Sequence, residues 1–405
     1  MTREVSNWLD SYLEYSSNTE SPTSYHLWCG ISAIAGALQR KVYLHWGVGQ
    51  TLYPNLYIVL VGPAGRTRKG VAIGIAKDLL RELTNVKIAP ESASGQQAMT
   101  LVMKEAYGNF IDPTDGQSKL HCSTTVFSEE LSVFLGQGNI AYLANLTDWY
   151  DSKEEWEYQS VGRGKDKLNG VCLNFLGGTA PDWIQSMIPQ EAVGGGFTSR
   201  VIFVVEEKKG KIVPEPVMTA REIQLRKQLR NDLERINKMA GEMTMNDGCR
   251  RKYVNWYKSE SAAAEAGHPA IDDARFASYC ERRATHLRKL LMVVSAARGD
   301  DLILTEEDFD RTLRFLEAAE RNMSKTFGGF GKSRTSDATE TIKNFICGMR
   351  HTTRGLVLQR YYLDVDAPTL SGIEQTLEQM GCIKTEPYIV DGKMDKKYYW
   401  VGEAA

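Results

Sequence analysis

The chain has 405 residues, with 49 Lys and Arg against 51 Asp and Glu, so its formal net charge is −2. This balance excludes a strong overall positive field, and any contact with nucleic acid must come from local basic patches. With a hydrophobic content of 42%, the chain can bury a large core, which we expect to be divided into two or three domains.

Residues 1–50 are predicted to form an N-terminal helical element, because apolar residues recur there with helical spacing. The pattern changes at residues 56–61, a continuous apolar run between Pro54 and Gly62 that is typical of a strand buried on both faces. Similar runs at residues 124–127, 171–176 and 201–205 predict a mostly parallel sheet flanked by helices. We therefore expect an α/β core over residues 51–206.

The loop after the first core strand has the composition of a phosphate-binding loop. Glycines let successive backbone N–H groups point at phosphates, and a lysine at the start of the next helix neutralises their charge. Lys69 is placed for that role, before a helical pattern at residues 71–80. The nucleotide-binding residues predicted from this pattern are Gly62, Pro63, Ala64, Gly65, Arg66, Thr67, Arg68, Lys69, Gly70 and Val71.

The loop departs from the standard pattern next to the lysine. Arg68 precedes Lys69 where glycine is usual, and Gly70 follows it where a Ser or Thr normally supplies a hydroxyl to Mg²⁺. Thr67 could supply that hydroxyl from a rearranged loop, or acidic residues and water alone could hold the metal. Taken by itself, the segment could also be a packing turn whose Arg66, Arg68 and Lys69 are solvated.

A pair of carboxylates follows the apolar run at residues 124–127. Nucleotide hydrolases use acidic residues at the end of a buried strand to hold Mg²⁺ and to polarise the attacking water. In that role Glu129 would bind the metal and Glu130 would act as the general base. Adjacent glutamates are also common in the solvated first turn of a helix. The upstream lysine makes the catalytic interpretation the stronger one.

Two further candidates stand beside later strands. Thr179 follows the run at residues 171–176 and could direct a hydroxyl at the γ-phosphate, although this segment could equally be an ordinary turn. Arg200 lies between a glycine-rich stretch and the run at residues 201–205, so it could reach a neighbouring subunit's nucleotide as an arginine finger. The alternative for Arg200 is an ion pair with a local carboxylate.

Residues 156–161 and 168–171 flank a basic segment and predict a hairpin with a positively charged tip. Its cations, Arg163, Lys165 and Lys167, would grip the phosphates of single-stranded DNA in a central channel. A mobile, solvated loop is the alternative interpretation.

The rest of the chain is predicted to be a helical region over residues 207–326, a glycine-rich linker over residues 327–335 and a separate domain over residues 336–405. This last domain shows three helical segments and a hairpin with an Asp-Gly turn, the order of elements in a winged helix. Its acidic residues offset its basic ones, so it could bind DNA or a protein partner.

Three segments resemble a family of replication ATPases of phages and mobile elements. They are residues 21–28, residues 52–57 and the loop at residues 62–70, and the likeness covers about residues 20–325. The Arg68-Lys69-Gly70 form of the loop is similar to that of the family, where a threonine often follows and this chain has Val71. The resemblance implies an ATPase.

The helical region also resembles the lid of an AAA+ motor, with the minichromosome maintenance type as the nearest comparison. There, Ser199 and Arg200 match the finger motif, and Arg282 or Arg283 would be a second sensor arginine. The resemblance implies an α/β P-loop NTPase core of the AAA+ or RecA type, with a helical lid and a C-terminal winged helix. It also implies a hexameric ring that moves on DNA.

The cysteines and the N-terminus bear on the compartment. The seven cysteines are never spaced as CxxC, which indicates reduced thiols rather than a disulfide or zinc framework. No signal segment is visible, and no stretch approaches the roughly 20 apolar residues that span a bilayer. We expect a cytoplasmic protein without a membrane partner.

The predicted function is an ATP-dependent DNA motor that uses ATP and Mg²⁺ and acts on single-stranded DNA. A replicative helicase of a phage or mobile element, working with other replication proteins, fits the resemblance best. Two alternatives stay open: an ATP-dependent helicase loader or initiator, and a nucleotide-binding DNA adaptor that does not hydrolyse ATP.

Overall fold

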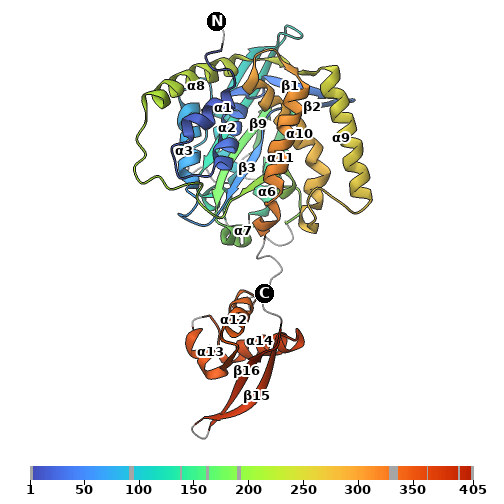
Figure 1. The fold of residues 1–405 in the computed structure, drawn as a ribbon. Coiled ribbons are helices and arrows are strands. Elements are labelled where there is room, and N and C mark those ends of the chain that lie inside the picture. The colour runs from blue at the N-terminus through green and yellow to red at the C-terminus, as the bar shows by residue number, and fades with distance from the viewer. Residues whose placement is uncertain are drawn as a thin grey trace. The chain divides into compact units, whose positions relative to one another are not determined.

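The computed structural model describes residues 3–90, 95–136, 139–160, 164–188, 193–327, 336–362, 364–390 and 393–402. The chain divides into two units, Met1–Gly328 and Gly329–Ala405 (Figure 1). The division falls within the predicted linker, of which only Phe327 lies among the described residues.

A mostly parallel sheet runs through the first unit. Its strand order is β10-β3-β9-β6-β4, with every neighbouring pair parallel, and β5 (Tyr107–Ile111) joins β6 in antiparallel fashion. The parallel strands are β3 (Tyr57–Val61), β4 (Lys87–Ile88), β6 (Ser118–Ser128), β9 (Val171–Thr179) and β10 (Val201–Val205). Every residue of β3, β9 and β10 is buried, as expected for strands covered on both faces. The predicted α/β core with a mostly parallel sheet is confirmed.

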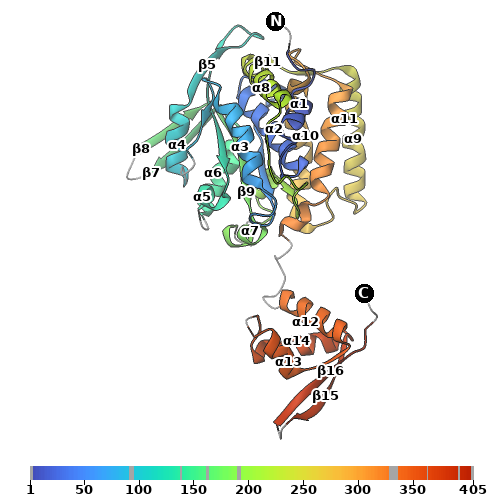
Figure 2. The same ribbon diagram turned by 60° about the vertical axis from the view of Figure 1, so that its left-hand side comes forward.

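Helices cover both faces of this sheet (Figure 2). On β9, Asn174 donates to Ser32 of α2 (Thr23–Leu38) at 3.0 Å, whereas the next side chain, Phe175, stacks on Phe134 of α5 (Leu131–Leu135). α3 (Lys69–Arg81) packs beside α2. On the α5 side, the Tyr57 hydroxyl donates to a carbonyl of α6 (Ile140–Tyr150) at 2.8 Å. Helices from both sides therefore enclose the central strands.

The prediction that residues 1–50 are wholly helical is wrong in its last part. α1 (Trp8–Ser16) and α2 are present, but β1 (Val42–Trp46) and β2 (Gln50–Leu52) follow them as an antiparallel pair. β1 also pairs in parallel with β11 (Gly241–Glu242), far along the chain. Local apolar spacing does not reveal a strand whose partner is so distant in sequence.

The helical region over residues 207–326 packs within the first unit. α8 (Ala220–Lys238) lies against α1, and α10 (Ala277–Arg298) contacts α2 and α11 (Glu306–Glu320). α11 in turn contacts α9 (Asp247–Glu265). The short parallel strands β12 (Thr244–Met245) and β13 (Ile303–Leu304) precede α9 and α11 and join the beginnings of these two helices.

The second unit contains the three helices and the hairpin predicted for residues 336–405. Its elements are α12 (Ser336–Met349), β14 (His351–Thr353), α13 (Arg354–Arg360), α14 (Ala367–Gln379), β15 (Ile383–Val390) and β16 (Lys393–Trp400). The sheet order is β14-β16-β15, and the unit has a buried core of its own around Ile346, Leu377 and Tyr398. The Asp391-Gly392 turn lies outside the described residues. Among the helices described in either unit, none combines the length and hydropathy needed to span a bilayer.

Candidate functional site

The loop at residues 62–68 joins the end of β3 to the start of α3. Lys69 is the first residue of α3, and its Nζ donates to the carbonyl oxygen of Gly62 at 2.6 Å. The backbone N–H of Gly62 donates to the carbonyl of Thr179 on the neighbouring strand β9 at 3.1 Å. Gly65 has a φ of 67°, a left-handed conformation that glycine adopts freely. The lysine is therefore folded over the loop, at the N-terminus of a helix.

The loop is one residue longer than the standard pattern. Counted from Gly62, that pattern places the lysine at position 68, which is Arg68. In the structure α3 begins at Lys69. The additional residue is Arg68, whose φ of 53° is left-handed. Lys69 therefore has the expected position of a phosphate-loop lysine relative to the helix.

The space beside Gly70 is occupied by a carboxylate. A Cβ at position 70 would lie 2.8 Å from Oε2 of Glu129. A Ser or Thr side chain at position 70, as in the standard pattern, would therefore meet the Glu129 carboxylate. Thr67 does not supply the hydroxyl of that pattern in this conformation, because it is fully buried and its hydroxyl is directed at the Pro63 carbonyl, 3.5 Å away.

Residues from three strand ends line one cavity of about 490 Å³. Lys69 follows the loop after β3, Glu129 and Glu130 follow β6, and Ala180 follows β9. The lining residues are Ala64, Gly65, Arg68, Lys69, Gly70, Val71, Glu129, Glu130, Ala180 and Trp183. The cavity lies at the carboxyl edge of the sheet, which is where open α/β sheets bind their ligands.

The cavity brings an ammonium group together with two carboxylates. Burial lowers the pKa of Lys69, and the negative charge of Glu130 opposes that shift. The Ser128 hydroxyl donates to the Glu130 carbonyl at 2.8 Å and so stabilises the turn that carries both glutamates. This arrangement holds the lysine and the carboxylates at the same end of the sheet.

No group of three or more His, Cys, Asp or Glu within the described ranges could hold a metal ion alone. Mg²⁺ needs no such group when it binds one or two carboxylates together with substrate phosphates and water. Glu129, whose carboxylate fills the space beside Gly70, fits that mode of binding.

Thr179 and Arg200 do not line the cavity. Thr179 ends β9 beside the loop, but it is buried and its hydroxyl donates to the Ala180 carbonyl at 3.2 Å. The Arg200 guanidinium donates to Asp151 at 2.7 and 3.2 Å and to the Gly196 carbonyl at 2.8 Å. Arg200 thus makes the local ion pair that the sequence left open as its alternative, and a finger role would require that pair to break.

The two sensor candidates differ, and neither lines the cavity. Arg283 is buried and binds Glu320 at 2.8 Å and also Glu260, so it connects α10 to α11 and α9. Arg282 is half-buried; burial first, and then the positive charge of Arg200, lower its pKa. Arg283 is therefore an internal ion-pair residue, whereas Arg282 lies near Arg200.

The predicted hairpin is present as β7 (Glu155–Ser160) and β8 (Gly164–Asn169). Arg163 lies outside the described residues. Lys165 pairs with Glu157 at 2.7 Å, and Lys167 pairs with Glu155 at 2.8 Å. Glutamates on the opposite strand therefore offset the charge that the prediction assigned to DNA contact.

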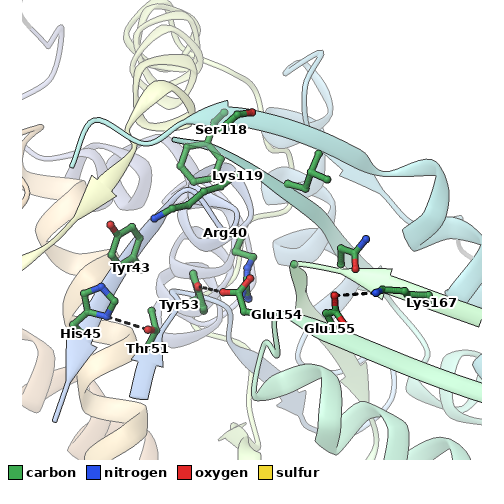
Figure 3. A pocket seen from close by; sticks show the side chains of 14 residues that line it. Arg40, Tyr43, His45, Thr51, Tyr53, Ser118, Lys119, Glu154, Glu155 and Lys167 are labelled. Carbon is green, nitrogen blue, oxygen red and sulfur yellow. Dashed lines mark hydrogen bonds and ion pairs between the residues drawn. The ribbon is translucent and has the colours of Figure 1, made fainter. Parts of the chain in front are cut away.

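A second cavity, of about 540 Å³, lies near the beginnings of β6 and β9 (Figure 3). Its polar groups bind one another: Glu154 accepts hydrogen bonds from Arg40 at 2.6 Å and from Tyr53 at 3.2 Å, and Lys167 pairs with Glu155. These in-chain pairs offset the charges of the cations around this cavity. It also lies at the amino edge of the sheet, away from the edge where such folds bind nucleotides.

Trp183 is a cavity residue that the sequence pattern does not reveal. It belongs to α7 (Pro181–Met187), which begins directly after β9. Pro181 is the available signal, since proline is common in the first turn of a helix. A helix beginning there carries its first turn to the carboxyl edge of the sheet.

No protein-family model matches the chain, and no curated protein matches its sequence. The arrangement of Lys69, Glu129 and Glu130 therefore carries the functional interpretation.

Proposed function

We propose that the chain binds a nucleoside triphosphate in the cavity at the carboxyl edge of the sheet and hydrolyses it. The observation that carries this proposal is the convergence of Lys69, Glu129 and Glu130 from strands that are not neighbours, since β9 lies between β3 and β6. A packing turn after β3 would require neither an open cavity beside the lysine nor a pair of carboxylates across it. ATP with Mg²⁺ in a P-loop NTPase core of the AAA+ or RecA type fits this arrangement.

In the proposed reaction, the first N–H groups of α3 and the Lys69 ammonium bind the β- and γ-phosphates. Glu130 accepts the proton of the attacking water. Glu129 provides the carboxylate that would bind Mg²⁺. Mg²⁺, held by Glu129 and phosphate oxygens, would supply charge neutralisation at the transferred phosphoryl group. The partial burial of Lys69 strengthens its interaction with phosphate, because less water screens the charge.

The wider proposal is a motor on single-stranded DNA that assembles as a hexameric ring and acts as a replicative helicase. It draws on the β7–β8 hairpin with Lys165 and Lys167, and on a second unit whose elements follow the order of a winged helix. The helical region over residues 207–326 would be the lid, and other replication proteins would be partners.

The observed charges favour a second candidate, a helicase loader or initiator that remodels a protein partner. Lys165 and Lys167 pair with glutamates of their own hairpin. α14, which would be the recognition helix of a winged helix, contains no Lys or Arg. Neither feature offers the unpaired cations that contacts with DNA phosphates require.

Steady-state ATP hydrolysis tests the proposed reaction. Lys69→Ala and Glu130→Gln should each lower turnover by about 100-fold or more, as expected when phosphate-binding or water-activating groups are removed. Lys87→Ala removes a lysine of β4 that pairs with Glu105 outside the cavity, and it should hydrolyse ATP at the normal rate. Unchanged turnover in both cavity variants would show that the reaction does not take place there.

The dependence on DNA separates the candidates. A motor should hydrolyse ATP faster with single-stranded DNA, and the double change Lys165→Ala and Lys167→Ala should remove that stimulation. A loader should respond to its protein partner and not to DNA alone. An adaptor should bind ATP without turning it over.

A further inference from the structure

Arg68 keeps a backbone conformation that is unfavourable for an arginine. Its φ of 53° is in the left-handed region, which costs a residue with a Cβ about 1 kcal/mol and which glycine adopts freely. The Ser21 hydroxyl donates to the Arg68 carbonyl at 2.7 Å and helps to hold this conformation. An arginine at a position suited to glycine suggests that its side chain has a role.

The Arg68 side chain is bound by Glu20, in the segment between α1 and α2. Arg68 Nε donates to Glu20 Oε2 at 3.0 Å, and Lys209 Nζ donates to Glu20 Oε1 at 2.6 Å. Hydrogen bonds from Lys209 and Arg68 lower the pKa of Glu20 to about 2, so the carboxylate stays ionised at neutral pH. The Glu20 carboxylate therefore binds two cations, and one of them, Arg68, belongs to the loop at residues 62–68.

The same arginine lines the phosphate cavity, and its side chain is 51% exposed. Arg68 Nε donates its hydrogen bond to Glu20. Within the part of the chain that the structure describes, the two terminal amino groups of Arg68 have no partner. A guanidinium fork suits two phosphate oxygens. The cavity sets Lys69 against two carboxylates, and Arg68 is the other cation among its lining residues, so it can add positive charge for a triphosphate.

We propose that Arg68 is a second phosphate-binding cation of this cavity and that Glu20 is its internal competitor. Without nucleotide, Glu20 holds the guanidinium; a bound triphosphate draws its terminal amino groups to phosphate oxygens. Lys209 stays with Glu20 when Arg68 leaves, so the carboxylate keeps a partner. The inference rests on the proposed nucleotide binding and assigns a regulatory contact to that site.

If Glu20 competes with phosphate for Arg68, substitutions of Arg68 and of Glu20 should change the affinity for a triphosphate in opposite directions. Arg68→Gly removes the cation together with the left-handed strain, so the Kd for a triphosphate should rise about 10-fold while the Tm of the free protein stays the same or rises. Glu20→Gln weakens the hold on Arg68, so the Kd should fall severalfold. If the ion pair only stiffened the loop, both changes would weaken binding.

Isothermal titration of the full chain with a non-hydrolysable ATP analogue, and separately with inorganic tripolyphosphate, measures these constants. Arg81→Ala removes an exposed arginine from the last turn of α3 and is the matched control, with no expected change. Arg68→Asn also lacks the charge and tolerates left-handed backbone, so it replaces Arg68→Gly if the glycine loosens the loop.

Weaker binding with the Arg68 variants and tighter binding with Glu20→Gln would support the proposal. Weaker binding with both, or unchanged binding without Arg68, would overturn it and leave the nucleotide site intact, because the wild-type chain still binds. Absence of binding by the wild-type chain would overturn the nucleotide site itself, and this inference with it.

Discussion

At the scale of single residues, Gly178 sets how closely the two sides of the cavity beside Lys69 approach each other. A Cβ at this position would lie 2.9 Å from the Glu129 carbonyl oxygen and 3.6 Å from the Cβ of Lys69. The end of β9 therefore packs directly against the lysine and the acidic turn. The Glu129 carbonyl oxygen belongs to the backbone and cannot rotate away as a side chain can, so position 178 has little room for a side chain.

Gly178→Ala should lower both stability and ATP turnover. The added methyl group pushes β9 from the Glu129 backbone, and overpacking of this kind costs about 1–3 kcal/mol of unfolding free energy. Gly74→Ala in α3 is the control, because a Cβ at this position would meet nothing within 4 Å. This substitution should raise the unfolding free energy by about 0.5–1 kcal/mol. Urea denaturation and turnover measure both effects. Normal turnover in Gly178→Ala would contradict the positioning role.

Lys289 is a buried cation that should make stability depend on pH. Its ammonium donates to Asn55 Oδ1 at 2.7 Å, and burial lowers its pKa to about 7. Above pH 7 the folded chain releases this proton while the unfolded chain retains it up to about pH 10, so unfolding takes up a proton. The unfolding free energy should therefore rise with pH across this window.

Lys289→Met removes that titration and isolates its contribution. The stability of the wild type relative to the variant should increase by about 1.4 kcal/mol per pH unit above pH 7 and should be constant at lower pH. Chemical denaturation of both proteins between pH 6 and 9 measures the difference. A difference that does not change with pH would contradict a lowered pKa.

At the scale of elements, an internal ion pair joins the helices α9, α10 and α11. Arg283 and Glu320 have side chains that are 6% and 4% exposed, and Glu260 of α9 binds the same guanidinium. Burial raises the pKa of Glu320, and its hydrogen bonds from Arg283 oppose that rise. Each charge of this buried pair therefore offsets the cost of burying the other.

Arg283→Met should destabilise the first unit by about 3–5 kcal/mol, because it leaves the Glu320 carboxylate buried without its cation. The double variant Arg283→Met with Glu320→Leu should recover most of that loss, since an apolar pair of similar volume replaces the ion pair. Thermal unfolding and ATP turnover are measured together. A double variant that is stable yet inactive would argue for the sensor role of Arg283 and against a purely structural one.

At the scale of the whole molecule, the two units have separate cores. The first encloses the parallel sheet and the candidate site, and the second has its own apolar cluster around Leu377 and Tyr398. The residues that line the cavity beside Lys69 all belong to the first unit. Binding and hydrolysis of a nucleotide by one chain should therefore not need the second unit.

A chain that ends at Gly328 should fold cooperatively and hydrolyse ATP without DNA at the wild-type rate. Stimulation by DNA or by a protein partner should be lost if the second unit supplies that contact. Circular dichroism during thermal unfolding and steady-state turnover check the two expectations. An unfolded product would show that the second unit stabilises the first.

Much of the core could be predicted because its signals are local. The apolar runs that become β3, β6, β9 and β10 are continuous in sequence, and the glycine loop lies between β3 and the helix that begins at Lys69. The structure also confirms that Glu129 and Glu130 directly follow a buried strand. The three helices and hairpin of the second unit follow from local periodicity in the same way.

The remaining features depend on contacts between distant segments. Pairing of β1 with β11, the ion pair of Arg200 with Asp151 and the contact of Arg68 with Glu20 leave no trace in local spacing. The sequence by itself determined the α/β class of the core and the residue types of the loop at residues 62–68, because buried strands and glycine turns are set by neighbouring residues. Only the tertiary structure decided which charges meet in the cavity, because side-chain pairing depends on segments that folding brings together.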